Sequence, residues 1–115
     1  MNIENAEWHD DNDKIDDILQ NYELIGRFPT YCPICGMCDI HIYMHLHDSK
    51  TRRGGIWIWC GNCHVFSHRS IYVPQYWENY ENEPAMLYAV PFNLDIIKSK
   101  IDYHVNNILS TRKHE

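Results

Sequence analysis

The sequence lacks any apolar run approaching the roughly 20 residues of a membrane-spanning helix, and no apolar segment follows a basic N-terminus. We therefore expect neither a membrane anchor nor a secretory signal. We expect a cytoplasmic location instead. Internal repeats and low-complexity tracts are also missing. Hydrophobic residues make up 44% of the 115-residue chain, which predicts one folded domain spanning 1–115 rather than a disordered chain.

Basic side chains are in short supply, with ten Lys and Arg against 16 Asp and Glu and a net charge of −6. This balance disfavours general binding to DNA. The charge is also uneven. Residues 1–29 carry eight acidic side chains against two basic ones, whereas residues 30–73 carry four basic side chains against Asp39 and Asp48. The sequence thus predicts an acidic N-terminal region beside a mildly basic central region.

Cysteine is confined to residues 31–68, and four of the five cysteines form two C-x2-C pairs separated by 24 residues. Two thiolates on a tight turn can hold a metal ion from one side, and a second pair returned by a hairpin completes a tetrahedron. Four thiolates leave no open coordination position, so such a site is structural rather than catalytic. We predict one structural Zn²⁺ bound by Cys32, Cys35, Cys60 and Cys63.

Three other side chains leave the ligand set open. Cys38 also forms a C-x2-C pair with Cys35, which allows a shifted pairing, although turn residues frame the pair that starts at Cys32 better. His64 and His68 are alternative nitrogen ligands.

Two resemblances follow from this stretch. Cys32-Pro33-Ile34-Cys35-Gly36 and Cys60-Gly61-Asn62-Cys63 resemble the zinc ribbon of transcription elongation factors and many small prokaryotic proteins, which implies a local fold but no function. Those factors carry an acidic pair at the hairpin tip, where this chain has Lys50-Thr51-Arg52-Arg53 instead. The stretch from Arg53-Gly54-Gly55-Ile56 to Val73-Pro74-Gln75-Tyr76-Trp77 resembles small bacterial immunity proteins that accompany toxin genes, which implies a toxin partner.

The hydrophobic periodicity predicts the elements around this stretch. Apolar residues three and four apart predict an amphipathic helix from Asp13 to Tyr22 and another over 94–110 that begins at the N-cap Asn93. Alternation predicts antiparallel strands over 39–47 and 56–59, with a third over 65–71. The expected fold class is α+β, a small antiparallel zinc-ribbon sheet flanked by an N-terminal and a C-terminal amphipathic helix. Its regions are 1–29 (acidic N-terminal helix region), 30–73 (zinc ribbon), 74–92 (acidic-aromatic connector) and 93–110 (C-terminal helix).

The alternation gives the hairpin one aliphatic face and one aromatic face. We expect the aliphatic face to pack on the helices, which would leave an exposed aromatic patch suited to binding. Coverage of this face by the C-terminal third is the equally weighted alternative. The residues of the aromatic face are His41, Tyr43, His45, His47, Trp57 and Trp59.

These features predict a binding protein rather than an enzyme. His41, His45 and His47 could share a metal ion or a phosphate, but no nucleophile or carboxylate pair accompanies them at a recognisable spacing. The polar side of the C-terminal helix is expected to hold Asp95, Lys98, Lys100 and Asp102 in solvent.

Two functions fit, and the net charge favours the first. In the first, the protein docks on and neutralises a protein partner, a bacterial toxin such as a basic nuclease. The predicted contact residues are Asp13, Asp16, Asp17, Tyr43, Trp57, Trp59, Tyr76, Trp77, Glu78, Glu81 and Glu83. In the second, a transcription-associated ribbon binds nucleic acid through Lys50, Arg52, Arg53 and Arg69. The oligomeric state is left open.

Overall fold

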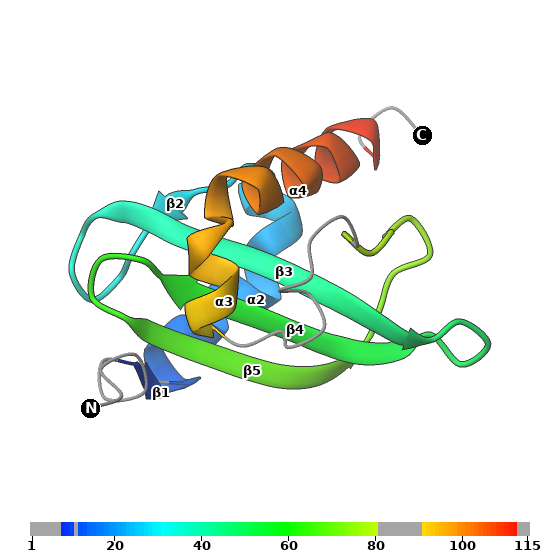
Figure 1. Cartoon of the computed structure of the whole chain (residues 1–115), viewed down its shortest axis with the longest axis horizontal. Coiled ribbons are helices and arrows are strands. Elements are labelled where there is room, and N and C mark those ends of the chain that lie inside the picture. Colours follow the sequence, from blue (N-terminus) through cyan, green and yellow to red (C-terminus); the bar gives the residue numbers. More distant parts are fainter. Residues whose placement is uncertain (1–7, 11, 81–90, 113–115) are drawn as a thin grey trace.

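The computed structural model describes residues 8–10, 12–80 and 91–112. Within them lie a mixed five-stranded sheet, in the order β1-β5-β4-β3-β2, and three helices (Figure 1). The strands are β1 (His9–Asp10), β2 (Thr30–Tyr31), β3 (Cys38–Asp48), β4 (Arg53–Cys60) and β5 (Val65–Tyr72), and the helices are α2 (Asn12–Ile25), α3 (Pro91–Ile96) and α4 (Lys98–Arg112). The α+β class is confirmed. The sheet is mixed because β1 runs parallel to β5.

Strands β3, β4 and β5 form the antiparallel centre of the sheet that the alternating pattern predicts. Ile42 lies opposite Ile58, and Tyr43 lies opposite Trp57, so the aliphatic and aromatic side chains separate onto two faces. The turn between β3 and β4 is shorter than expected, because β3 continues to Asp48 and β4 begins at Arg53. We refer to this turn as the hairpin tip.

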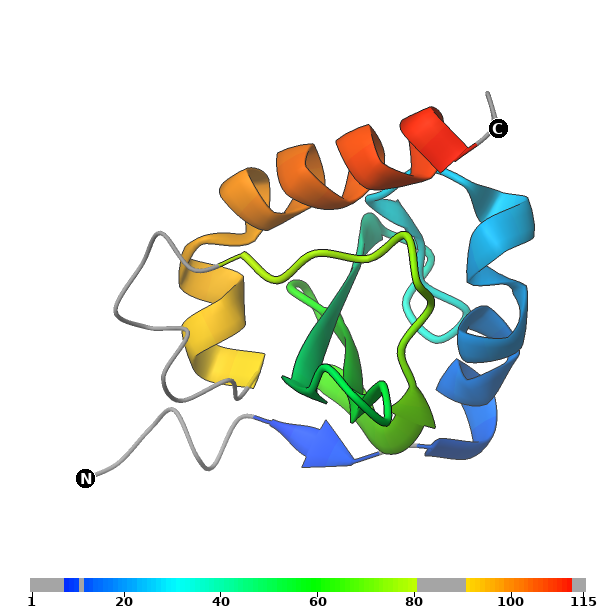
Figure 2. The same cartoon turned by 90° about the vertical axis from the view of Figure 1, so that its right-hand side faces the viewer.

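Helix α2 covers the aliphatic face and buries Ile15 and Ile18. Helices α3 and α4 contact the sheet from the aromatic face, and Figure 2 shows α2 and α3 on opposite sides of the sheet with α4 running across it. In the described part of the chain, no helix has the length and apolar character needed to cross a membrane.

The single helix predicted over 94–110 is wrong in two respects. The helical segment begins at Pro91 rather than at an Asn93 cap, and it breaks at Ile97 into α3 and α4. Proline is favoured in the first turn of a helix. The N–H groups of that turn have no partner within the helix, so proline loses no hydrogen bond there. Leu94 and Ile101 are nevertheless buried, as the spacing predicted.

Both faces of the sheet are covered. Tyr43 and Trp59 are 0% exposed and Trp57 is 8% exposed, so the expected exposed aromatic patch is wrong and the alternative, coverage by the C-terminal third, is confirmed. Trp77 closes the same face, since its indole N–H donates to the Met44 carbonyl at 2.8 Å. The physical reason is size, because a chain this short has little other apolar surface with which to build a core.

Two asparagine amides each pair with both the backbone N–H and the carbonyl of one residue, as a neighbouring strand would. Asn79 accepts the Leu46 N–H at 2.7 Å and donates to the Leu46 carbonyl at 3.0 Å. Asn106 does the same for Phe28, at 2.8 and 2.6 Å. Such pairing satisfies edge groups that would otherwise need solvent or another chain.

Candidate metal centre

The four predicted cysteines come together at the end of the sheet opposite the hairpin tip. Their Sγ atoms all lie within 4.8 Å of one another, and the Cys32–Cys63 and Cys35–Cys60 sulfurs are each 3.7 Å apart. All four are free thiols. Among the described residues, this is the only group of three or more Cys, His, Asp or Glu side chains with ligand atoms so close. The cluster can hold a metal ion.

Each cysteine pair lies on a turn of the same construction. The Gly36 N–H donates to the Cys32 carbonyl at 2.9 Å, and the His64 N–H donates to the Cys60 carbonyl at 3.0 Å. Both donors have left-handed backbones, with φ of 80° and 61°. Glycine adopts this conformation without strain, whereas histidine does so at a cost of order 1 kcal/mol.

Backbone N–H groups within these turns point at sulfur. Ile34 donates to Cys32 Sγ, and Asn62 donates to Cys60 Sγ, each at 3.4 Å. Such hydrogen bonds stabilise a thiolate, and thiolates are the form that binds metal.

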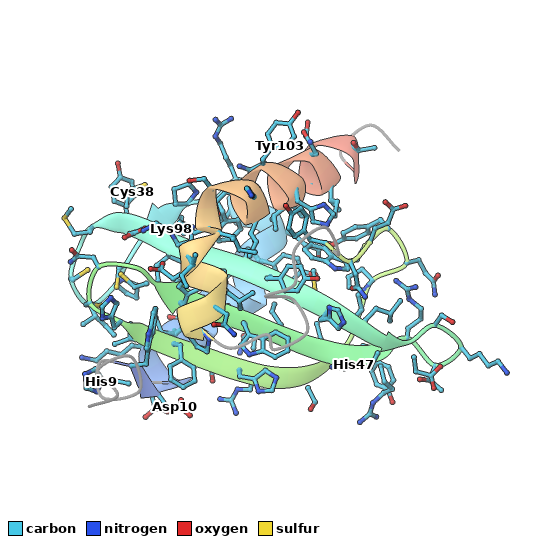
Figure 3. The ribbon with its side chains drawn as sticks, viewed as in Figure 1. His9, Asp10, Cys38, His47, Lys98 and Tyr103 are labelled. Atoms are coloured by element: carbon cyan, nitrogen blue, oxygen red, sulfur yellow. The ribbon has the colours of Figure 1, made fainter. Side chains whose placement is uncertain are left out.

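The alternative ligands lie outside the cluster. Cys38 is exposed, and its S–H donates to the Pro29 carbonyl at 3.6 Å (Figure 3). The His64 ring packs on Trp8, with ring centroids 4.5 Å apart. His68 stacks on Trp57 at 4.2 Å.

The thiols of the cluster titrate differently. Hydrogen bonds from the Met37 backbone and from the Asn62 amide lower the pKa of Cys35 to about 6. Burial raises the pKa of Cys60 and of Cys63. At neutral pH the Cys35 thiolate is therefore ready to attract a cation, whereas metal binding by Cys60 and Cys63 must release protons.

A charged network lies beneath the second cysteine turn, where β3 meets α3 and α4. Its residues are Asp39, His41, Asp95, Lys98 and Asp102. The side chain of His41 is 3% exposed. Its Nδ1 lies 2.8 Å from both carboxylate oxygens of Asp102, and its Nε2 lies 2.6 Å from Asp39 Oδ1.

His41 is held as an imidazolium. Ionised carboxylates only accept hydrogen bonds, so both ring nitrogens donate. Burial alone would lower the pKa of His41, but Asp102 and Asp39 outweigh it and raise the pKa. The pKa of Asp39 is lowered, because hydrogen bonds from His41 and Lys98 outweigh the effect of burial.

The rest of the network links the helices to the sheet. Lys98, at the junction of α3 and α4 in Figure 3, places Nζ 3.2 and 3.3 Å from the Asp39 oxygens. Asp95 accepts the Trp59 indole N–H at 3.2 Å. The expectation that Asp95, Lys98 and Asp102 lie in solvent is wrong, since they face the sheet and Asp102 is 9% exposed. Their spacing of three and four residues was the available signal, because it places them on one helical face.

Gly61 joins the cysteine turn to this network. Its N–H donates to the Asp39 carbonyl at 2.9 Å. A Cβ at this position would lie 2.6 Å from Asp39 Oδ2 and 2.7 Å from both Asp95 Oδ1 and Lys98 Nζ. Only a residue without a side chain lets the turn rest on these charged groups, so the metal centre and α3 are in direct contact.

The residues predicted to bind a partner are dispersed. Tyr43, Trp57, Trp59 and Trp77 are buried, so they form no surface patch. Asp13, Asp17 and Glu78 are exposed, Asp16 and Tyr76 are half-buried, and Glu81 and Glu83 lie outside the described residues. Tyr76 donates to Glu23 at 2.8 Å.

Three of the four basic candidates form contacts within the fold, and the Arg53 guanidinium donates to the Tyr72 hydroxyl at 3.2 Å. Arg52 donates to the carbonyls of Val73, Pro74 and Trp77. Arg69 pairs with Asp16 at 2.6 Å. The side chains of Lys50 and Arg53 are exposed near the hairpin tip.

Comparisons with models of protein families, with curated proteins and with solved structures found no match. The resemblances to zinc ribbons and to immunity proteins gain no support from them. The geometry of the sites therefore carries the functional interpretation.

Proposed function

We propose that the cysteine cluster binds one Zn²⁺ as a structural ion. A zinc ion with Zn–S bonds of about 2.3 Å in a tetrahedron separates its sulfurs by about 3.8 Å. The Cys32–Cys63 and Cys35–Cys60 sulfurs are each 3.7 Å apart. This agreement, with the closed set of four thiolates, is the observation that supports the assignment.

Native mass spectrometry of the protein, purified without a polyhistidine tag, tests the assignment. We expect one zinc ion per chain, and after exchange with Co²⁺ a visible spectrum of tetrahedral thiolate coordination. The Cys60→Ser variant should lose the ion, whereas Cys38→Ser should keep it. Retention of zinc by Cys60→Ser, or a metal-free protein that stays folded with a strong chelator, would refute the structural role.

We propose further that the protein is a cytosolic binding protein that docks on a basic protein partner through the outer surface of α2. This surface exposes Asp13, Asp17 and Glu23. The supporting observation is the charge on this helix, which carries Asp13, Asp16, Asp17 and Glu23 against Lys14. With a net charge of −6, the exposed surface favours a positively charged partner.

A toxin domain that acts on nucleic acid is the partner we favour. Such a domain must carry positive charge to hold phosphates, and a protein that blocks it gains association rate from acidic side chains. The role is that of an immunity protein, in keeping with the resemblance drawn from the sequence.

Capture from lysate of the protein's own host at low salt tests this role. We expect the zinc-loaded protein to retain a stoichiometric basic protein. The double variant Asp13→Asn/Asp17→Asn should associate with it several-fold more slowly, an effect that added salt removes.

Glu78→Gln is the matched control, since Glu78 is an exposed carboxylate on a different segment. An equal effect of Glu78→Gln would assign the effect to net charge rather than to α2. Unchanged association of the double variant would remove α2 from the interface.

Binding to nucleic acid is the second candidate, and one observation favours it. The Arg53 guanidinium lies 5.1 Å from the ring centre of Tyr72, which is 70% exposed, and Lys50 is exposed nearby. A cation beside an exposed ring can bind phosphate and stack on a base. Lys50→Ala/Arg53→Ala should then weaken binding to single-stranded DNA and reduce its salt dependence by roughly one counterion per residue. No detectable binding at low salt by the unmodified protein would end this candidate.

A further inference from the structure

Three histidines gather on the aromatic face towards the hairpin tip, at the opposite end of the sheet from the cysteines. They are His45 and His47 on β3 and His68 on β5. Figure 3 shows His47 near the tip and Cys38 at the far end of the sheet. The described structure gives these imidazoles no part in the metal centre or in the charged network.

Gly55 on β4 leaves room for the His68 ring above the sheet. It pairs with His45 on β3 and with Ser70 on β5. A Cβ on Gly55 would lie 2.9 Å from His68 Nε2 and 3.3 Å from the Trp57 ring. The Nε2 atom of His68 therefore reaches over the glycine that neighbours His45.

The positions of His68 and His47 are set by different contacts. The His68 ring lies on Trp57 with an angle of 17° between the planes, which fixes the direction of Nε2. His47 lies two residues from His45 on the same strand, and their ring centres are 5.2 Å apart. His47 is exposed, so its ring can rotate at little cost.

A hydroxyl relay can set the tautomer of His45. Its Nδ1 lies 3.1 Å from Tyr43 Oη, which accepts the Tyr80 N–H at 3.0 Å and lies 3.4 Å from the Tyr80 carbonyl. When Nδ1 carries the proton and donates to Tyr43 Oη, the tyrosine O–H donates to the Tyr80 carbonyl. Nε2 is then the unprotonated nitrogen, as a metal ligand must be.

We propose that His45, His47 and His68 form a second metal site, for a divalent transition ion bound through imidazole nitrogens. Imidazole suits zinc, nickel, copper and iron but not magnesium or calcium. The ligand nitrogens of the three histidines do not all lie within 4.8 Å of one another, so binding requires side-chain rotation, for which exposed His47 has room. Three ligands at an exposed position leave further coordination to water or to a side chain of a partner, unlike the closed cysteine site.

Calorimetric titration with Ni²⁺ tests the proposal on zinc-loaded protein at a pH where the histidines are neutral. The protein carries no polyhistidine tag. We expect one Ni²⁺ per chain in addition to the zinc. His47→Asn should weaken binding roughly tenfold or more. His45→Asn and His68→Asn should do the same. Because His47 is exposed, its variant keeps the fold, and an unchanged zinc content verifies this.

His9→Asn is the matched control, since His9 is exposed on β1 and lies opposite Val65, at the cysteine end of the sheet. Gly55→Ala should also weaken Ni²⁺ binding, because the new Cβ displaces the His68 ring. Absence of Ni²⁺ binding beyond the zinc, unchanged affinity in His47→Asn, or an equal loss in His9→Asn would each overturn the proposal. So would release of zinc with a nickel–thiolate absorption band, which would place the nickel among the cysteines.

Discussion

The two faces of the central sheet follow the same alternation but are closed by different forces. On the aliphatic face, α2 covers isoleucines such as Ile56 and Ile58, each 1% exposed, and the ion pair between Asp16 and Arg69 lies at the rim. On the aromatic face, α3 and α4 are joined to the sheet by charged groups that surround His41. Apolar burial is non-directional, whereas ion pairs with hydrogen bonds require particular partners at particular distances.

This difference ties the aromatic face, but not the aliphatic one, to the metal centre. Gly61 rests on Asp39, Asp95 and Lys98, so a movement of the second cysteine turn disturbs the groups that hold α3 and α4. Helix α2 contacts β4 and β5 and carries none of the network residues. We therefore expect the two faces to respond differently to loss of metal.

Removal of the metal should have the largest effect. Structural zinc sites contribute on the order of 10 kcal/mol in small metal-bound domains. During partial removal with a chelator, amide hydrogen exchange measured by mass spectrometry should rise first in 91–112 and later in 12–25. Gly61→Ala, which crowds the same contact, should give a smaller change in the same order. Simultaneous loss of protection in both segments would show that the faces are not separately coupled to the metal.

The network and the apolar layer can be compared through one substitution on each face. Asp102→Ala leaves His41 charged in a buried site and should cost about 3–5 kcal/mol. Ile58→Ala should cost about 2–5 kcal/mol through lost burial and a cavity. Urea unfolding of the zinc-loaded variants gives both values. The loss of unfolding free energy relative to the unmodified protein should change with pH for Asp102→Ala and stay constant for Ile58→Ala.

The sequence predicted what local spacing determines. The two C-x2-C pairs identified all four clustered cysteines, and alternation from Ile40 to Leu46 separated the two faces of β3. Contacts between residues distant in the chain could not be predicted. His41 contacts Asp102, which lies 61 positions away, and hydrophobic periodicity carries no information about such a pair. The role of Arg52 was hidden for the same reason, because its left-handed backbone (φ 63°) and the carbonyls of 73–77 that it binds exist only in the folded chain.

The charged network predicts a loss of stability at alkaline pH. His41 has a raised pKa in the folded state, so its stabilising contribution is complete below its unfolded value of 6.5 and is lost as pH rises through the folded pKa. The zinc-loaded protein should therefore lose stability relative to Asp102→Asn as pH increases above neutrality. Thermal unfolding in excess zinc measures the difference and cancels effects common to both proteins. A constant difference from pH 6 to pH 9 would mean that His41 is not the titrating group.

The ion pair at the rim of the aliphatic face should give the smallest effect. Asp16 accepts from Arg69 Nη2 at 2.6 Å, but the Arg69 side chain is 42% exposed, so water and salt screen the attraction. Asp16→Asn should shift the urea midpoint less than either buried substitution, and the shift should shrink further in high salt. Asp17→Asn is the matched control, since Asp17 is exposed on the same helix. A shift for Asp16→Asn as large as that for Ile58→Ala would contradict the difference between the two faces. It would mean that a directional polar contact also holds the aliphatic face closed.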